Sequence, residues 1–303
     1  MYHTRSRTKR DPREKLFIAF EGTKTEPLYF EGLIEKEEKN LNVEIIPLYR
    51  GPGREGDSNP KKIVDQVYDY FQWVHGRDYS TNLFIEHVLQ SAIKIAPDKK
   101  SELNGELFRE MKHALTRSKY ADDRHIMDRD EALLECRRLI AERIGKINVD
   151  LPYPLSVSDS ARFFIVVDRD CRSFTEEQCE YVCKKCKENN FELIVSNPCF
   201  ELWLLLHFNV GKEQLANYLF RNNGLKGLIE DITKRDSLDF NCYHHRIGRA
   251  RRCLRDEYCE DLQYLLMPTD YLNGTMFNIG TNMGALIDII FSKGYPERDE
   301  VLR

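Results

Sequence analysis

Short apolar runs alternate with longer stretches of helical periodicity along much of this 303-residue chain. The elements expected in chain order are strand 15–20, helix 26–40, strand 42–49, helix 59–74, strand 162–168, helix 175–190, strand 191–196 and helix 198–208. Short apolar runs are typical of buried strands, and strands that alternate with helices are typical of a parallel sheet. The sequence therefore predicts an α/β fold with a mostly parallel sheet flanked by helices.

Residues 76–158 interrupt this alternation. Segments 82–96, 102–116 and 129–146 place apolar residues at helical spacing, with no strand-like run between them. We therefore expect an all-helical insertion, with 151–160 as the return linker. The expected organisation is a first part of the core at 1–75, the insertion at 76–158, a second part of the core at 159–210 and a helical C-terminal region at 211–303.

Composition excludes some classes of protein. With a net charge of -4, the whole chain does not indicate a nucleic-acid or membrane partner, so any such partner must be recognised locally. There is no apolar stretch of about 18 residues, and the N-terminus is polar and basic, so we expect a cytoplasmic protein. Nine irregularly spaced cysteines favour reduced thiols over a disulfide framework.

Acidic residues follow two of the expected strands. Glu21 ends the first strand and Glu26 begins the next helix, while Asp168 and Asp170 follow the third strand. Ligands of open parallel sheets bind outside the carboxyl ends of the strands, so these acids converge if the two strands are neighbours. A divalent cation would relieve their repulsion, and oxygen ligands without a nearby histidine favour Mg²⁺ or Mn²⁺ over zinc. Arg169 would then point the opposite way.

Each motif also has an ordinary structural interpretation. Asp-Arg-Asp after a strand is typical of a turn that caps a helix, and Thr-Glu before an apolar run is typical of a helix start. Gly22 alone fits a tight turn. Their combination at the ends of two strands favours a shared metal site.

Three stretches occur in the order FEGTKTEPLYFEGL, VVDRD and SNPCFELWLLLHF. Together they resemble the RloB-like (AbiL-type) branch of the Toprim superfamily, over the first 75 residues and residues 162–210. The resemblance implies a compact Toprim fold. It also implies that Asp168 and Asp170 are the metal-binding Asp-x-Asp, that Glu21 is the acid after the first strand, and that Glu26 is the second acid of nuclease-type members.

The resemblance implies a Mg²⁺-dependent endonuclease, because metal-dependent phosphodiester cleavage is the usual chemistry of nuclease-type members. It further implies a toxic effector of a two-gene antiphage system, encoded beside an ABC- or SMC-like ATPase. The resemblance also suggests the tRNA-attacking Toprim effector of the PARIS system as a functional analogue. RNA and DNA both remain open as substrates. A non-catalytic Toprim module that binds nucleic acid or the ATPase is the alternative, although a scaffold has no need for mutually repelling acids.

Two further sets of residues are weaker candidates for the site. Glu201 is an acid in a strongly apolar helix, where it fits either the catalytic site or a local backbone hydrogen bond. The basic stretch 244–255 predicts nucleic-acid contacts, although the acids that follow it also fit a solvated helix face. The expected nucleic-acid contacts are Arg246, Arg249, Arg251 and Arg252.

Cys179, Cys183 and Cys186 share one face of an expected helix. They fit a zinc site, but they also fit small buried side chains. The paired Cys-x-x-Cys motifs that would favour zinc are absent. The helical insertion is expected to mediate self-association, docking onto the ATPase, or both. A subdomain that only buttresses the core is the alternative.

Overall fold

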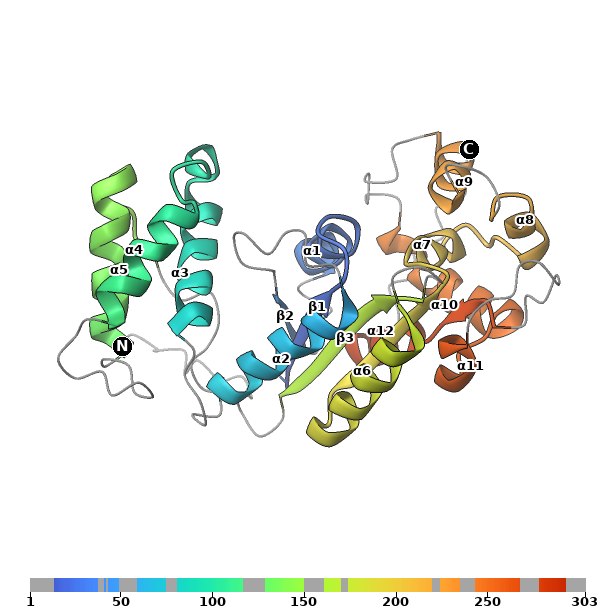
Figure 1. The fold of residues 1–303 in the computed structure, drawn as a ribbon. Helices are drawn as coiled ribbons and strands as arrows, with labels where there is room; N and C mark the ends of the chain where they lie inside the picture. Colours follow the sequence, from blue (N-terminus) through green and yellow to red (C-terminus); the bar gives the residue numbers. More distant parts are fainter. Residues whose placement is uncertain are drawn as a thin grey trace, which may run out of the picture.

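The computed structural model describes residues 14–37, 41, 43–48, 59–74, 81–116, 129–149, 161–169, 174–219, 224–234, 243–267 and 278–292. Its centre is a five-stranded sheet in the order β2-β1-β3-β4-β5 (Figure 1). The strands are β1 (Glu14–Phe20), β2 (Val43–Leu48), β3 (Arg162–Asp168), β4 (Glu192–Asn197) and β5 (Gly280–Thr281). The first four are parallel and β5 is antiparallel, so the predicted α/β fold with a mostly parallel sheet is confirmed.

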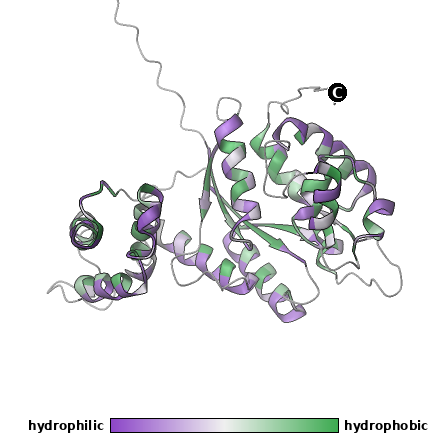
Figure 2. Ribbon diagram, turned by 90° about the horizontal axis from the view of Figure 1, so that it is seen from above, coloured by the Kyte–Doolittle hydropathy of each residue, from purple (hydrophilic) through white to green (hydrophobic). Residues whose placement is uncertain are grey.

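Helices cover both faces of the sheet. The helices of the described residues are α1 (Thr25–Glu37), α2 (Pro60–Val74), α3 (Thr81–Ile95), α4 (Gly105–Thr116), α5 (Arg129–Ile144), α6 (Glu176–Asn189), α7 (Glu201–Leu206), α8 (Lys212–Ala216), α9 (Gly224–Thr233), α10 (Ile247–Glu257), α11 (Leu262–Leu266) and α12 (Met283–Ile290), with short 3₁₀ turns at Pro97–Lys99 and His244–Arg246. Alternate residues of β1 enter two separate cores: Ile18 packs with α1, α7, α10 and α12, and Phe17 packs with α2 and α6. Burial on both faces explains why the strands read as unbroken apolar runs. In Figure 2 these hydrophobic strands lie between the flanking helices.

The described residues of the insertion form helices and connecting turns, with no strand among them. Helices α3, α4 and α5 pack against one another beside the core (Figure 1). Leu107 and Met111 of α4 and Ile140 of α5 are fully buried. The ring of His87 on α3 lies 5.3 Å from that of Tyr70 on α2, so the insertion contacts the core through α2. The expected linker 151–160 and the glycine-rich loop 51–58 lie outside the described residues.

The C-terminal region is mainly helical, but it also completes the sheet. Thr281 pairs with Ser196 of β4, and the side chain of Asn282 bonds to the backbone of Val195 and Leu193. The helix expected at 198–208 is shorter, since α7 spans Glu201–Leu206, and the amide of Phe200 just before it donates to Asp168 Oδ1. In the described part of the chain, none of the helices combines the length and the apolar character needed to cross a membrane.

Candidate functional site

The carboxyl ends of β1 and β3 lie side by side, which is the condition for the acids after these strands to converge. Phe20 pairs with Val166, and the Glu21 amide donates to the Val166 carbonyl at 2.9 Å. Beyond these ends lies a pocket of about 590 Å³, which we call the carboxylate pocket. Its lining residues are Glu21, Gly22, Thr23, Lys24, Thr25, Glu26, Asp168, Cys199, Glu201 and Lys226.

Glu21 and Asp168 are joined through the backbone. The Asp168 amide donates to Glu21 Oε2 at 2.8 Å, which ties the tip of β1 to the tip of β3. Asp168 Oδ1 in turn accepts a hydrogen bond from the amide of Phe200 at 2.8 Å. The carboxylate of Asp168 therefore connects β3 with the residues that lead into α7.

Glu26 reaches the same pocket from the first turn of α1. Its Oε1 accepts a hydrogen bond from the Gly22 amide at 3.0 Å, and the residue is 4% exposed. A Cβ atom on Gly22 would overlap the Glu26 carboxylate. Glycine at this position therefore lets the Glu26 carboxylate approach the backbone closely. The N-terminus of α1 also favours a negative charge.

Glu201 lines the pocket too, so the structure places this weaker candidate beside the other acids. It is 6% exposed, and Lys226 Nζ from α9 lies 3.4 Å from its Oε1. Glu201 raises the pKa of Lys226, because the negative charge stabilises the ammonium form. Lys226 was missed by sequence reasoning, since a lysine on an amphipathic helix resembles any solvated lysine.

The pocket disfavours ionisation of Asp168. Burial raises the pKa of Asp168 well above its usual value, and the negative charges of Glu26, Glu21 and Glu201 raise it further. Burial likewise raises the pKa of the Cys199 thiol. A bound cation would reverse this repulsion.

The donor set fits a hard divalent cation, because its side chains offer carboxylate oxygens. Within the described residues, however, no three acidic, histidine or cysteine side chains form a ready metal-binding group. Glu21 and Glu26 instead point an oxygen at backbone amides. Holding a metal would require these side chains to turn toward it. Asp170, the remaining predicted ligand, lies outside the described residues.

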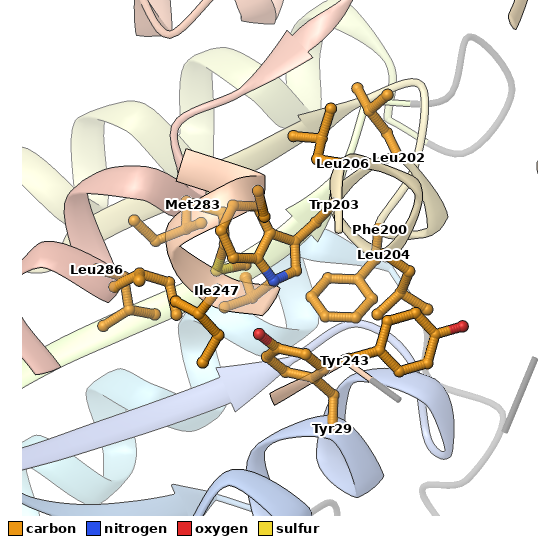
Figure 3. Close-up of a cluster of buried hydrophobic side chains, with 14 of the residues drawn as sticks. Tyr29, Phe200, Leu202, Trp203, Leu204, Leu206, Tyr243, Ile247, Met283 and Leu286 are labelled. Carbon is orange, nitrogen blue, oxygen red and sulfur yellow. The ribbon is translucent and has the colours of Figure 1, made fainter. Parts of the chain in front are cut away.

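Buried aromatic side chains of α1 and α7, among them Tyr29 and Trp203, belong to one hydrophobic cluster (Figure 3). The Tyr29 hydroxyl and His207 Nε2 are 3.3 Å apart, and His207 Nδ1 donates to the Trp203 carbonyl at 2.9 Å. Because the carbonyl can only accept, Nε2 is the acceptor for Tyr29. Tyr29 lies one turn after Glu26 on α1, and His207 follows α7, so this network links the two helices that carry Glu26 and Glu201.

The four predicted nucleic-acid contacts differ in their environments. Arg251 is buried, and its guanidinium binds Asp288 at 2.8 and 2.7 Å and Glu260 at 2.9 Å. It joins α10 to α12, and we remove it from the expected nucleic-acid contacts. Arg252 is exposed, Arg249 is partly exposed, and Arg246 lies over the ring of Phe208. The described lining of the carboxylate pocket includes none of the four.

The cysteine face of α6 is packed against the second core. Cys186 is buried, Cys179 and Cys183 are partly buried, and all seven described cysteines are free thiols, as expected. A hydrogen bond from Cys183 lowers the pKa of Cys179 to about 7. Among the described residues these cysteines form no group that could hold a metal, and their burial fits the packing interpretation.

A family model described as RloB-like protein matches residues 16–290. The match spans both parts of the core, the insertion and most of the C-terminal region. Neither the curated proteins nor the solved structures gave a match.

Proposed function

Because this chain belongs to the RloB-like protein family, we propose that it is a metal-dependent nuclease that hydrolyses phosphodiester bonds of RNA, tRNA included, or of DNA. The observation that carries this proposal is that Glu21, Glu26, Asp168 and Glu201 line one pocket. Gathering like charges in a buried pocket costs free energy, because each carboxylate opposes the ionisation of the others. A catalytic cation site gives a reason to bear that cost, and a scaffold does not.

The residues take distinct roles in this proposal. Glu21, Glu26 and Asp168, together with Asp170, would hold Mg²⁺ or Mn²⁺. A bound ion would neutralise charge that develops on the phosphate and would promote in-line attack. Glu26 is also the candidate general base, since it sits at the N-terminus of α1 within the same pocket. Lys226, at the rim beside Glu201, offers a positive charge to an incoming phosphate.

Substrate and partner complete the proposal. Arg246, Arg249 and Arg252 are the proposed contacts to the nucleic-acid backbone, because each guanidinium can bind phosphate oxygens. We further propose that an ABC- or SMC-like ATPase encoded nearby keeps this nuclease silent until infection. Release would then make it a toxic effector. The alternative, a non-catalytic module that binds nucleic acid or the ATPase, predicts binding without cleavage.

Cleavage by the purified chain tests the proposal directly. Plasmid DNA and total tRNA would be incubated with the protein in Mg²⁺, in Mn²⁺ or in EDTA. We expect metal-dependent cleavage that falls about 10²-fold or more in Asp168→Asn, the range typical for loss of a charge-stabilising catalytic group.

Asp65→Asn is the matched control, because Asp65 binds Tyr181 and Lys185 away from the pocket. It should cleave as the wild type does. Wild-type cleavage by a folded Asp168→Asn variant would rule out the metal assignment. Nucleic-acid binding with no cleavage in either metal would favour the scaffold alternative.

A further inference from the structure

Arg169 directly follows the candidate ligand Asp168, yet it does not belong to the described lining of the carboxylate pocket. Successive side chains at a strand end point to opposite faces, so Arg169 turns into the protein where Asp168 turns to the pocket. Only 4% of the residue is exposed. Burying a guanidinium is costly unless its N–H groups find acceptors.

Backbone carbonyls from two other parts of the chain supply those acceptors. Arg169 Nε donates to the Leu266 carbonyl at 2.6 Å, and Arg169 Nη1 donates to the Phe174 carbonyl. The guanidinium also lies 5.5 Å from the centre of the Phe174 ring. Leu266 is the last residue of α11, where carbonyls lack partners within the helix. Arg169 therefore fastens the end of β3 to the end of α11 and to the residue before the α6 cap.

The backbone around Arg169 is fixed in the same place. Its amide donates to the Ser196 carbonyl of β4 at 2.8 Å. Next to Ser196, the side chain of Asn197 donates to the carbonyls of Leu265 and Met267 at 3.0 and 3.2 Å. The ends of β3 and β4 are thus both bound to the C-terminal end of α11.

We propose that Arg169 is a positioning residue, which anchors the end of β3 to α11 and thereby holds the Asp168 carboxylate in the carboxylate pocket. This inference rests on the proposed function of that pocket as a metal site. Arg169 touches neither metal nor substrate in this scheme. Its effect passes through the backbone to Asp168, whose amide and carboxylate already bridge Glu21 and Phe200.

The test compares Arg169→Met and Arg169→Lys with Arg162→Met. Arg162 is the first residue of β3, at the opposite end of the strand from Arg169, and its Nε donates to Glu192 at 2.6 Å. Mn²⁺ affinity would be measured by titration calorimetry. We expect about 10- to 100-fold weaker binding in Arg169→Met, the range typical when a residue that orients a metal ligand is lost. Arg169→Lys should be intermediate, and Arg162→Met should bind as the wild type does.

Two further readouts separate positioning from general destabilisation. At saturating Mn²⁺ the cleavage rate of Arg169→Met should recover most of its loss, because the ligands themselves are intact. Hydrogen exchange of metal-free protein should be faster at the Asp168 and Phe200 amides in Arg169→Met than in Arg162→Met. If Arg169→Met does not fold, the same comparisons apply to Arg169→Lys, which keeps a single cationic donor group.

A folded Arg169 variant with wild-type Mn²⁺ affinity and wild-type exchange at these amides would overturn the proposal. If the wild type binds no Mn²⁺, the proposed function fails. The hydrogen-exchange measurement alone then tests whether Arg169 anchors the end of β3. Faster exchange confined to the strand end would support the anchoring role, and equal exchange in both variants would refute it.

Discussion

We expect Asp168 to lower the stability of the protein without a cation and to raise it when a cation is bound. Its raised pKa means that ionising this carboxyl costs more free energy in the folded protein than in the unfolded chain. Asparagine keeps an acceptor for the Phe200 amide but carries no charge. In EDTA we therefore expect Asp168→Asn to melt at a higher temperature than the wild type. Added Mg²⁺ should raise the melting temperature of the wild type by mass action and leave that of the variant unchanged.

Thermal denaturation in EDTA and in millimolar Mg²⁺ measures both effects. Asp65→Asn serves as the control, because it weakens bonds to Tyr181 and Lys185 and should melt lower in both buffers. A variant at Asp168 that is less stable than the wild type in EDTA would contradict the repulsion on which the metal site is argued.

Gly22 offers a second single-residue prediction. An added methyl group would meet the Glu26 carboxylate, which is the end of a flexible side chain and can move away. Gly22→Ala should therefore cost little stability, about 1 kcal/mol or less. It should nevertheless weaken Mn²⁺ binding, since Glu26 loses its position.

Titration calorimetry with Mn²⁺ checks this prediction, and Gly105→Ala is the control variant. A Cβ on Gly105 meets nothing within 4 Å, so that variant should match the wild type in both properties. Unchanged Mn²⁺ affinity in Gly22→Ala would remove Glu26 from the proposed ligands.

Helix α5 carries the most exposed large apolar side chain of the described residues, Leu134, at 68% exposure. Leu134 borders a mainly apolar pocket of about 610 Å³ between α5 and the residues that follow it. If the insertion docks onto the ATPase, Leu134→Asp should abolish co-elution of the two proteins without changing the melting temperature. Size-exclusion chromatography with light scattering measures both co-elution and self-association.

Ile95→Asp is the matched control, because Ile95 is also exposed on the insertion but lies at the end of α3. Loss of co-elution in both variants would show a general effect of added charge. Unchanged assembly in both would leave the insertion as a buttress of the core.

The elements that sequence reasoning predicted are those with a periodic signal. The apolar runs before Glu21 and Asp168 mark strands, and the rule that ligands bind at their carboxyl ends brings these acids together. Strand β5 has two residues, too few for a period, and the Asn282 side chain next to it accepts a hydrogen bond from the Val195 amide of β4.

The direction in which a side chain points was the second limit on prediction. The sequence shows that Arg251 is charged but not that it turns inward, because its partner Asp288 lies 37 residues away. Lys226 was missed for a similar reason, since its distance from Glu201 depends on how α9 packs against α7.

Stability against pH is a property of the whole molecule, because both cores contain neutral histidines. Burial lowers the pKa of His87 and His207 to about 3 and that of His244 to about 4. In the unfolded chain these histidines take up protons near pH 6.5. Their contribution to the free energy of unfolding is therefore fully present above that pH and falls as the pH drops toward 4. The raised pKa of Asp168 acts in the opposite sense.

Comparing how the unfolding free energy of two variants changes with pH separates the contribution of one histidine from that of the acids. Between pH 7.5 and pH 5, His207→Gln should lose about 2 kcal/mol less unfolding free energy than the wild type. Urea denaturation in EDTA at several pH values gives the slopes. His113→Gln, at an exposed position on α4, is the control and should keep the wild-type slope. A wild-type slope in His207→Gln would mean that His207 is already charged in the fold.

The bond from Arg169 to Leu266 spans 97 residues. A ribosome adds about 5 to 20 residues per second, so the acceptor is synthesised about 5 to 20 s after the arginine. Strand β4 gains its neighbour β5 later still. A nascent chain that already contains every acid of the pocket thus lacks the anchor for Asp168. For an enzyme proposed to be toxic, translation itself would delay activity until the C-terminal region has emerged and the chain can meet its ATPase.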